Sequence, residues 1–450
     1  MSIPVNALLG LWGVFVLANM LPPAMFPPGQ AAGAFGMQGL PLAPGDALRA
    51  LGTHLGHALI ACWVLLAIHG AGSVVRRVMR LGNDWLMASL PLGLVILPAA
   101  GLGLGLAGLA CPAVLWASSG FLVAVGCANW VSGAVRAQAS VGIRRASLAG
   151  GGANWVSGAG GKAVGAKDGV GFAGRRPSRV RVFPDGVGLP VKLLVVAVAV
   201  AALPGALAPE VTYDAVAYHT GAPALFLKLH KIVRLDGMFF TDMPLGLQMA
   251  YMFCAGIGKA TDLTAGPAKF LHFALGLAAV LAAGRLGGRL GGARGERSSR
   301  AIRSGSLGEG SSPCASFAGA RAAAWAMVFT AATPHLAVQM MKANVDLGVM
   351  FLSVAGAYRL IGVPGAAGAL AAGACLGASA SMKLTGGYGV CAGAAVLVAR
   401  PRLLAVFLVG AAAPLGPWLA KSWLLCGNPV YPFLFQLLGG TGWTAENAAA

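Results

Sequence analysis

Apolar stretches of about 20 residues recur along almost the whole chain, and they constrain its fold more than any other feature. A helix of this length crosses the roughly 30 Å hydrocarbon core of a bilayer and satisfies its backbone hydrogen bonds internally. Hydrophobic residues make up 57% of the 450 residues and charged residues only 10%, so lipid must be the solvent for most of the chain. The sequence therefore predicts an all-α, polytopic transmembrane helical bundle. We expect about 11 spans, near residues 3–21, 55–75, 86–108, 111–132, 190–208, 264–284, 322–340, 343–362, 365–383, 385–399 and 402–420.

The basic residues that give the chain its formal net charge of +19 lie mostly between the predicted spans. Arg76, Arg77 and Arg80 follow the second span, residues 136–192 hold ten Lys or Arg against two Asp, and residues 285–321 hold seven Arg against two Glu. Even numbers of spans separate these segments, so the positive-inside rule places all of them in the cytoplasm. This pattern predicts a multi-pass protein of the cell (inner) membrane, whose partner is the lipid bilayer and not nucleic acid.

Two groups of predicted spans are separated by residues 136–189. This stretch is basic and rich in Gly and Ser, and we interpret it as a cytoplasmic linker that is too polar to pack. It divides an N-terminal four-span region, residues 1–135, from a second membrane region, residues 190–450. Residues 285–321 have a similar composition and are interpreted as another linker. The sequence Asn-Trp-Val-Ser-Gly at 129–133 recurs at 154–158, and we assign no role to this duplication.

A glycine-rich run, Gly101-Leu-Gly-Leu-Gly105, has some likeness to a phosphate-binding loop. It has no preceding strand and lies in an apolar helix, where small residues let helices approach closely. We therefore interpret it as a packing surface.

The predicted loop at residues 209–243 lies outside the cytoplasm on this topology and is unusually polar for this chain. The helical segment after it, residues 244–253, is too short to cross the bilayer, and we interpret it as an amphipathic helix at the outer interface. A carboxylate beside cations suits displacement at a sugar carbon with a lipid phosphate as the leaving group. Asp214 would take the proton of the acceptor hydroxyl, and Lys228, Lys231 or Arg234 would stabilise the phosphate. From chemistry alone, however, an ordinary solvated loop is the favoured interpretation.

Five segments of the second region resemble one known family. They are Ala208-Pro-Glu-Val-Thr-Tyr-Asp-Ala-Val-Ala-Tyr-His219, Asp242-Met-Pro244, Ala343-Asn-Val-Asp346, Ser381-Met-Lys-Leu-Thr385, and Pro417-Trp-Leu-Ala-Lys421 with Gly427-Asn-Pro-Val-Tyr-Pro432. Together they resemble the C-type (GT-C) membrane glycosyltransferases, which include the protein O-mannosyltransferases, the lipid A aminoarabinose transferases and bacterial relatives. All five fall at one membrane face of the predicted topology, and the resemblance covers residues 190–440.

The resemblance implies a GT-C-like membrane core with interfacial helices in its first long extracytoplasmic loop. Such an enzyme moves a sugar, with inversion, from a polyprenyl-phosphate-linked donor to a glycan, lipid or protein acceptor outside the cytoplasm. The resemblance makes Asp214 the general base and Asp242 and Asp346 further catalytic carboxylates, and it implies a divalent metal ion at Asp214 and Asp242. The residues that it assigns to substrate binding are His219, Lys383, Lys342, Glu210 and Lys421, with Lys383 facing the lipid phosphate.

The chain departs from the family pattern in three respects. Ala215 stands where a second acidic residue often follows the catalytic Asp, which puts the use of a metal in doubt. The four N-terminal spans have no assigned role. Many relatives continue into further spans or an outer domain, which leaves open whether the acceptor-binding part is complete.

Two alternatives to a glycosyltransferase stay open at this stage. A transporter or flippase for a lipid-linked or small polar substrate would place ionisable residues near the bilayer midplane, on broken helices in repeated halves. Lys342, Asp346 and Lys383 lie toward the ends of predicted spans instead, which favours the enzyme. An inactive relative that acts as a scaffold is the other alternative, and the missing second acidic residue suits it.

Overall fold

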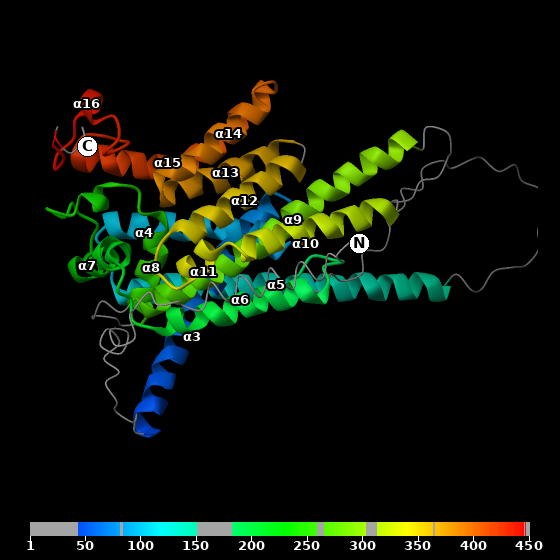
Figure 1. Ribbon diagram of the computed structural model, residues 1–450, viewed down its shortest axis with the longest axis horizontal. Helices are drawn as coiled ribbons and strands as arrows, with labels where there is room; N and C mark the ends of the chain where they lie inside the picture. The colour runs from blue at the N-terminus through cyan, green and yellow to red at the C-terminus, as the bar shows by residue number, and fades with distance from the viewer. Residues whose placement is uncertain are drawn as a thin grey trace, which may run out of the picture.

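The computed structural model describes residues 44–81, 84–150, 182–258, 265–302, 313–362, 365–444 and 446, and all regular elements in these residues are helices. The predicted all-α class is therefore confirmed for this part of the chain. Figure 1 shows most of the helices running side by side along the long axis of the molecule. The α-helices are α3 (Pro44–Val78), α4 (Leu90–Leu106), α5 (Pro112–Gly150), α6 (Leu189–Leu207), α7 (Gly221–Leu229), α8 (Gly246–Ile257), α9 (Gly266–Ile302), α10 (Pro313–Ala331), α11 (Pro334–Met340), α12 (Asp346–Gly362), α13 (Ala366–Met382), α14 (Gly387–Leu397), α15 (Pro401–Cys426) and α16 (Phe435–Leu438). Short π-helices, η1 (Trp85–Ser89) and η2 (Ala215–His219), and short 3₁₀-helices, η3 (Phe239–Asp242) and η4 (Leu384–Gly386), join them.

Six helical stretches of the described residues are long and apolar enough to cross a membrane. They are Gly52–Val78, Trp85–Leu106, Pro112–Ser132, Leu189–Leu207, Gly266–Arg294 and Pro401–Cys426. Each coincides with a predicted span, so these helices have the length and composition of a multi-pass membrane protein. The predicted span at residues 3–21 lies outside the described residues.

The four remaining predicted spans are helical but shorter or divided. The segment 322–340 is divided because α10 ends at Ala331 and α11 begins at Pro334. A proline has no N–H for the helix ladder and holds the residue before it, here Thr333, in an extended conformation. Helices α12 and α13 have 17 residues each, and α14 has 11. These segments are thus helical as predicted, except for the break within 322–340, whereas the number of about 11 spans is not established.

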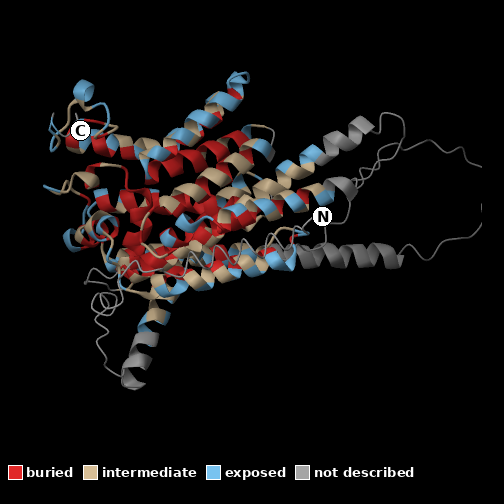
Figure 2. Cartoon of the chain, viewed as in Figure 1, coloured by how far each residue is buried: buried red, intermediate tan, exposed pale blue. Residues whose placement is uncertain are grey.

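Helix α8 is enclosed by other helices of the bundle, so the interpretation of residues 244–253 as an amphipathic helix with one exposed face is wrong. It packs against α4, α5, α7 and α9, and Tyr251, Met252 and Phe253 are at most 1% exposed. Apart from Gln248, all its sides are apolar or glycine, and a helix that is apolar all round is stable only when it is enclosed. Figure 2 shows α8 within the buried core. Gln248 is consequently held in the interior, beside the polar loop.

Glycines let the helices cross at very close range. A Cβ atom built on Gly93 of α4 would lie 1.7 Å from the carbonyl oxygen of Ile68 in α3. No side chain fits at such a distance, so the two backbones are in direct contact, as is typical of helix pairs in membranes. The run at residues 101–105 packs in a related way, because a Cβ atom on Gly101 would lie 2.9 Å from Cβ of Met249 in α8. Gly105 packs likewise against Ile232, whereas Gly103 has no atom within 4 Å, so the predicted role in packing is confirmed for two of the three glycines.

The helices α5 and α9 extend into the segments that the sequence analysis interprets as linkers. Helix α5 continues to Gly150 and α9 to Ile302, whereas residues 151–181 and 303–312 lie outside the described part. Adding residues to an existing helix costs little compared with nucleating one, so polar segments can prolong a stable span. In Figure 1 both helices extend beyond the rest of the bundle at the same end.

The arginines of the basic segments and the polar loop, residues 209–243, lie at opposite ends of the bundle. Arg285 of α9 forms an ion pair with Asp84 at 3.1 Å, and Arg359 of α12 donates a hydrogen bond to the carbonyl oxygen of Met87 in η1 at 2.9 Å. The basic segments therefore meet at one end, as expected for segments on one side of a membrane. The polar loop, with α7, lies at the opposite end (Figure 1).

Candidate functional site

A buried lysine fixes the start of the polar loop. Helix α6 ends at Leu207, and Nζ of Lys269 in α9 donates hydrogen bonds to the carbonyl oxygens of Gly205 at 2.7 Å and Ala208 at 2.6 Å. A cation at the C-terminus of a helix is favourable because the terminal carbonyl groups carry partial negative charge. Lys269 therefore holds the loop against the first turn of α9.

Glu210 joins the polar loop to the turn before α12. One of its oxygens accepts a hydrogen bond from the N–H of Thr212 at 3.0 Å, and the other accepts one from the N–H of Ala343 at 2.7 Å. The resemblance to GT-C enzymes assigns Glu210 to substrate binding. In the structure its carboxylate is occupied by these backbone groups, so its contribution is to hold two segments together.

Asp346 and Lys383 form an ion pair at this end of the bundle. Nζ of Lys383 lies 2.7 Å from Oδ1 of Asp346, and the two side chains are 48% and 35% exposed. Asp346 is the first residue of α12, and Lys383 is extended between α13 and η4. A lysine ammonium has three N–H donors, so this pair leaves donors of Lys383 open to a ligand.

The first turns of α8 and α12 meet beside this ion pair. A Cβ atom on Gly246 would lie 2.8 Å from Oγ of Ser381, two residues before Lys383. A Cβ atom on Gly348 would lie 3.0 Å from Cδ2 of Leu247. The free N–H groups at the start of a helix favour anions, so this end of the bundle suits a negatively charged group.

His219 is buried near the ion pair and is neutral. It is 5% exposed, and its Nδ1 lies 3.0 Å from Nε2 of Gln248. Burial lowers the pKa of His219 to about 3, and the charges of His272 and Lys383 act in the same direction, whereas Asp346 opposes them. At neutral pH the imidazole therefore offers hydrogen bonds without carrying charge.

Asp214 lies exposed at the start of η2, and its carboxylate has no hydrogen bond within the described part of the chain. Tyr218, one turn further on, stacks on Phe240 with their ring centroids 4.3 Å apart. Burial raises the pKa of Tyr218 to about 12, and the negative charges of Asp214 and Asp346 add to this effect. Both carboxylates are therefore within electrostatic reach of one tyrosine hydroxyl.

His272 of α9, which was not among the residues predicted from the sequence, fixes the turn that carries Asp346. It is fully buried, and its Nδ1 lies 2.8 Å from the carbonyl oxygen of Lys342 and 3.0 Å from that of Gln339. The N–H of Leu347 donates to its Nε2 at 3.1 Å. The sequence does contain a sign of this role, because a histidine inside an apolar span costs free energy and usually has a specific partner. Lys342, a predicted substrate ligand, contributes its backbone carbonyl to this arrangement.

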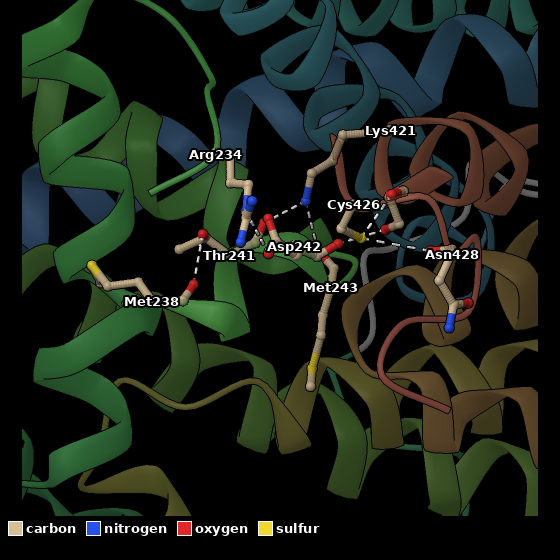
Figure 3. A network of polar contacts seen from close by, with 9 residues as sticks. Arg234, Met238, Thr241, Asp242, Met243, Lys421, Cys426 and Asn428 are labelled. Atoms are coloured by element: carbon tan, nitrogen blue, oxygen red, sulfur yellow. Dashed lines mark hydrogen bonds and ion pairs between the residues drawn. The ribbon is translucent and has the colours of Figure 1, made fainter. Parts of the chain in front are cut away.

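Asp242 belongs to a separate, buried group, which Figure 3 shows. Its Oδ2 lies 3.6 Å from Nε of Arg234, and burial raises the pKa of its carboxyl group while the charges of Lys421 and Arg234 oppose this effect. Lys421 of α15 is itself buried and donates hydrogen bonds to the carbonyl oxygens of Met243, at 2.9 Å, and Thr241. Lys421, predicted to bind substrate, therefore holds the turn that carries Asp242 and is shielded from a ligand outside.

The predicted metal ligands, Asp214 and Asp242, do not fit a divalent metal ion at Asp242. Two cationic side chains, Arg234 and Lys421, already face that carboxylate, and like charges repel. Within the described ranges no three His, Cys, Asp or Glu side chains gather as metal ligands would.

The structure thus sorts the predicted residues by position. Asp346, Lys383 and His219 gather at one end of the bundle, with Asp214 nearby. Glu210 and Lys342 take part in the hydrogen bonds that hold the backbone around them. Asp242 and Lys421 form the separate group.

Comparisons of the chain with protein-family models, with curated proteins and with solved structures find no match. The function must therefore be argued from the site itself.

Proposed function

We propose that the protein is a membrane glycosyltransferase that moves a sugar from a polyprenyl-phosphate-linked donor to an acceptor outside the cytoplasm. The observation that supports this most is the half-exposed ion pair of Lys383 and Asp346, which lies at one end of an apolar bundle with the exposed carboxylate of Asp214 nearby. A lipid-linked donor needs a cation for its phosphate at the membrane surface and a base that reaches the acceptor in water. This end of the bundle offers both.

Three side chains of the site, Asp214, Lys383 and Asp346, have a role in this proposal. The acceptor oxygen attacks the anomeric carbon while the bond from that carbon to the phosphate oxygen breaks, and the electron pair leaves with the phosphate. Asp214 takes the proton of the acceptor hydroxyl. Lys383 offers its open N–H donors to the departing phosphate, and Asp346 holds Lys383 in place. Attack from the face opposite to the leaving group inverts the configuration of the sugar.

Three buried ionisable residues at this end of the bundle argue against the alternative of a transporter or flippase. Lys269 and His272 lie in the first two turns of α9, and Lys421 lies in the last two turns of α15. Ion-coupled carriers instead keep such residues near the bilayer midplane, where they form the transport pathway. At the helix ends these residues bind backbone carbonyl groups and so serve the architecture of the loop.

The substitution Asp214→Asn tests the role of the proposed base. Removing a general base typically lowers the rate about 10²–10⁴-fold, and the exposed position of Asp214 means that the fold should be unaffected. The measurement is transfer of radiolabelled sugar from a panel of polyprenyl-phosphate hexose and pentose donors to acceptors in membranes that contain the full chain.

Asp236→Asn is the matched control, because Asp236 is an exposed carboxylate of the same loop and should leave transfer unchanged. Undiminished transfer by a folded Asp214→Asn variant would refute the proposed base. Movement of intact labelled donor across the membrane, without transfer, would favour the flippase. Neither activity in the wild-type protein would favour the inactive scaffold.

A further inference from the structure

An open cavity of about 460 Å³ lies at the end of the bundle opposite to the candidate site. It is formed between α9, α10, the end of α12 and the segment before α6. Its polar lining comprises Asp84, Asp185, Arg285, Arg289, Ser316 and Tyr358. None of these residues has a part in the proposed transfer reaction.

The cavity lies at the depth of the lipid headgroups. Helix α9 starts at Gly266, and Lys269 in its first turn holds the start of the polar loop. Arg285 and Arg289 are roughly 29 and 35 Å from Gly266 along the helix, at about 1.5 Å per residue. The hydrocarbon core of a bilayer is about 30 Å thick, so both guanidinium groups fall at the opposite polar surface of the membrane.

The guanidinium group of Arg289 is fixed in position and has donors that could bind a ligand. Its guanidinium stacks on the ring of Tyr358 at 4.1 Å and donates one hydrogen bond, at 3.1 Å, to the carbonyl oxygen of the same residue. Arg285 has a carboxylate partner in Asp84, but Arg289 has none within the described residues. A stacked, planar guanidinium with uncommitted donors is the geometry that binds a phosphate through two parallel hydrogen bonds.

Small residues of α9 and α10 form one wall of the cavity. Gly288 of α9 and Gly319 of α10 both line it, and a Cβ atom on Gly319 would lie 3.0 Å from the carbonyl oxygen of Gly288. The two helices therefore approach closely at these glycines, and the cavity lies beside this contact, next to Arg289. Its volume falls in the range of about 300–1,000 Å³ that is usual for sites of small molecules.

We propose that this cavity binds the headgroup of a membrane phospholipid, with its phosphate on Arg289, and that it prefers phosphoethanolamine. The lining contains two arginines, Arg285 and Arg289, and two carboxylates, Asp84 and Asp185, so its formal charges cancel. A purely anionic headgroup would be repelled by these carboxylates, whereas phosphoethanolamine carries a phosphate for the arginine and an ammonium for a carboxylate. The proposal does not depend on the glycosyltransferase activity.

Binding of short-chain phospholipids to the purified full chain in detergent tests this proposal. Phosphatidylethanolamine should bind and raise the unfolding temperature, because a ligand of the folded state stabilises it. Phosphatidylglycerol should bind more weakly, and phosphatidylcholine, whose ammonium has no N–H donor, more weakly than phosphatidylethanolamine. The substitution Arg289→Gln should lower the affinity for phosphatidylethanolamine at least tenfold, measured by native mass spectrometry.

Arg321→Gln is the matched control, because Arg321 is an exposed arginine of α10 that does not line the cavity. If Arg289→Gln does not fold, Asp185→Asn decides, since it should reduce the preference for phosphatidylethanolamine over phosphatidylglycerol. Equal binding of all three lipids, or unchanged binding by the Arg289→Gln variant, would overturn the proposal. Stabilisation by inorganic phosphate equal to that by the lipid would show an anion site without a lipid headgroup.

Discussion

His219 connects the candidate site to the stability of the fold. In an unfolded chain its pKa has the ordinary value of 6.5, and burial lowers the pKa to about 3 in the folded protein. Between these values the unfolded chain binds a proton that the folded chain does not bind, so the free energy of unfolding decreases as the pH falls from 6.5 toward 3. Above pH 6.5 the histidine is neutral in both states and contributes no dependence on pH.

We predict that His219→Asn makes the protein less sensitive to acid. Each proton bound only by the unfolded chain costs the fold about 1.4 kcal/mol per pH unit below 6.5. An asparagine accepts a hydrogen bond from Gln248 but does not titrate, so the variant should lose less stability between pH 6.5 and pH 5. The slope should diminish without vanishing, because the second buried imidazole, His272, is unchanged.

Unfolding temperatures in detergent at pH 7.5, 6.5, 5.8 and 5.0 provide the measurement. His230→Asn is the control, since His230 is exposed and has a positive φ of 56°, which Asn tolerates. This control should keep the wild-type dependence on pH. An equal dependence in all three proteins would contradict the neutral, buried state of His219.

Helix pairing depends on glycines that the apolar pattern alone does not distinguish. Gly93 and Gly103 both lie in α4, yet a Cβ atom on Gly93 would lie 1.7 Å from a backbone oxygen of α3, whereas one on Gly103 would have no atom within 4 Å. The difference lies in the neighbouring helix, which the local sequence does not specify. Small residues in spans are therefore either contact sites or neutral positions.

We predict opposite effects of the two substitutions Gly93→Ala and Gly103→Ala. The first forces α3 and α4 apart, and overpacking of this kind typically costs about 1–3 kcal/mol. The second removes a flexible residue from a helix without a clash and should be neutral or stabilising by up to about 1 kcal/mol. Unfolding temperatures of the two variants in detergent check this, and similar values for both would show that the helices do not cross at Gly93.

The sequence predicts which segments are helical because long apolar stretches determine this locally. It does not predict where α8 lies, because the same apolar residues suit a membrane interface and a buried core. The break between α10 and α11 has a local cause, Pro334, and could have been predicted from the sequence. The burial of Lys421 could not be predicted from the local sequence, because its partners are backbone carbonyls about 180 residues away in the sequence.

Assembly of the site is a property of the whole molecule. Glu210 contacts a residue 133 positions away, and Asp346 pairs with Lys383, 37 positions away. The resemblance to GT-C enzymes predicts that such residues share one face, but it gives no account of Lys269, His272 and Gln248, which hold the segments together. Their roles follow from buried carbonyl groups and side chains that need partners, and these become visible only in the folded chain.

The separation of the two ends of the bundle leads to the last prediction, which concerns the topology in the membrane. The polar loop lies at one end of the bundle, and Arg321 of α10 lies next to Ala320, which lines the cavity at the opposite end. A membrane-impermeant maleimide should therefore reach Asp236→Cys and Arg321→Cys from opposite sides. By the positive-inside rule, Asp236→Cys should react in right-side-out vesicles and Arg321→Cys only in inverted ones. Both positions are exposed, and the wild-type chain with its eight cysteines sets the background labelling. Reaction of both variants from the same side would show that the candidate site does not face the extracytoplasmic side. The site could then not reach an acceptor outside the cytoplasm.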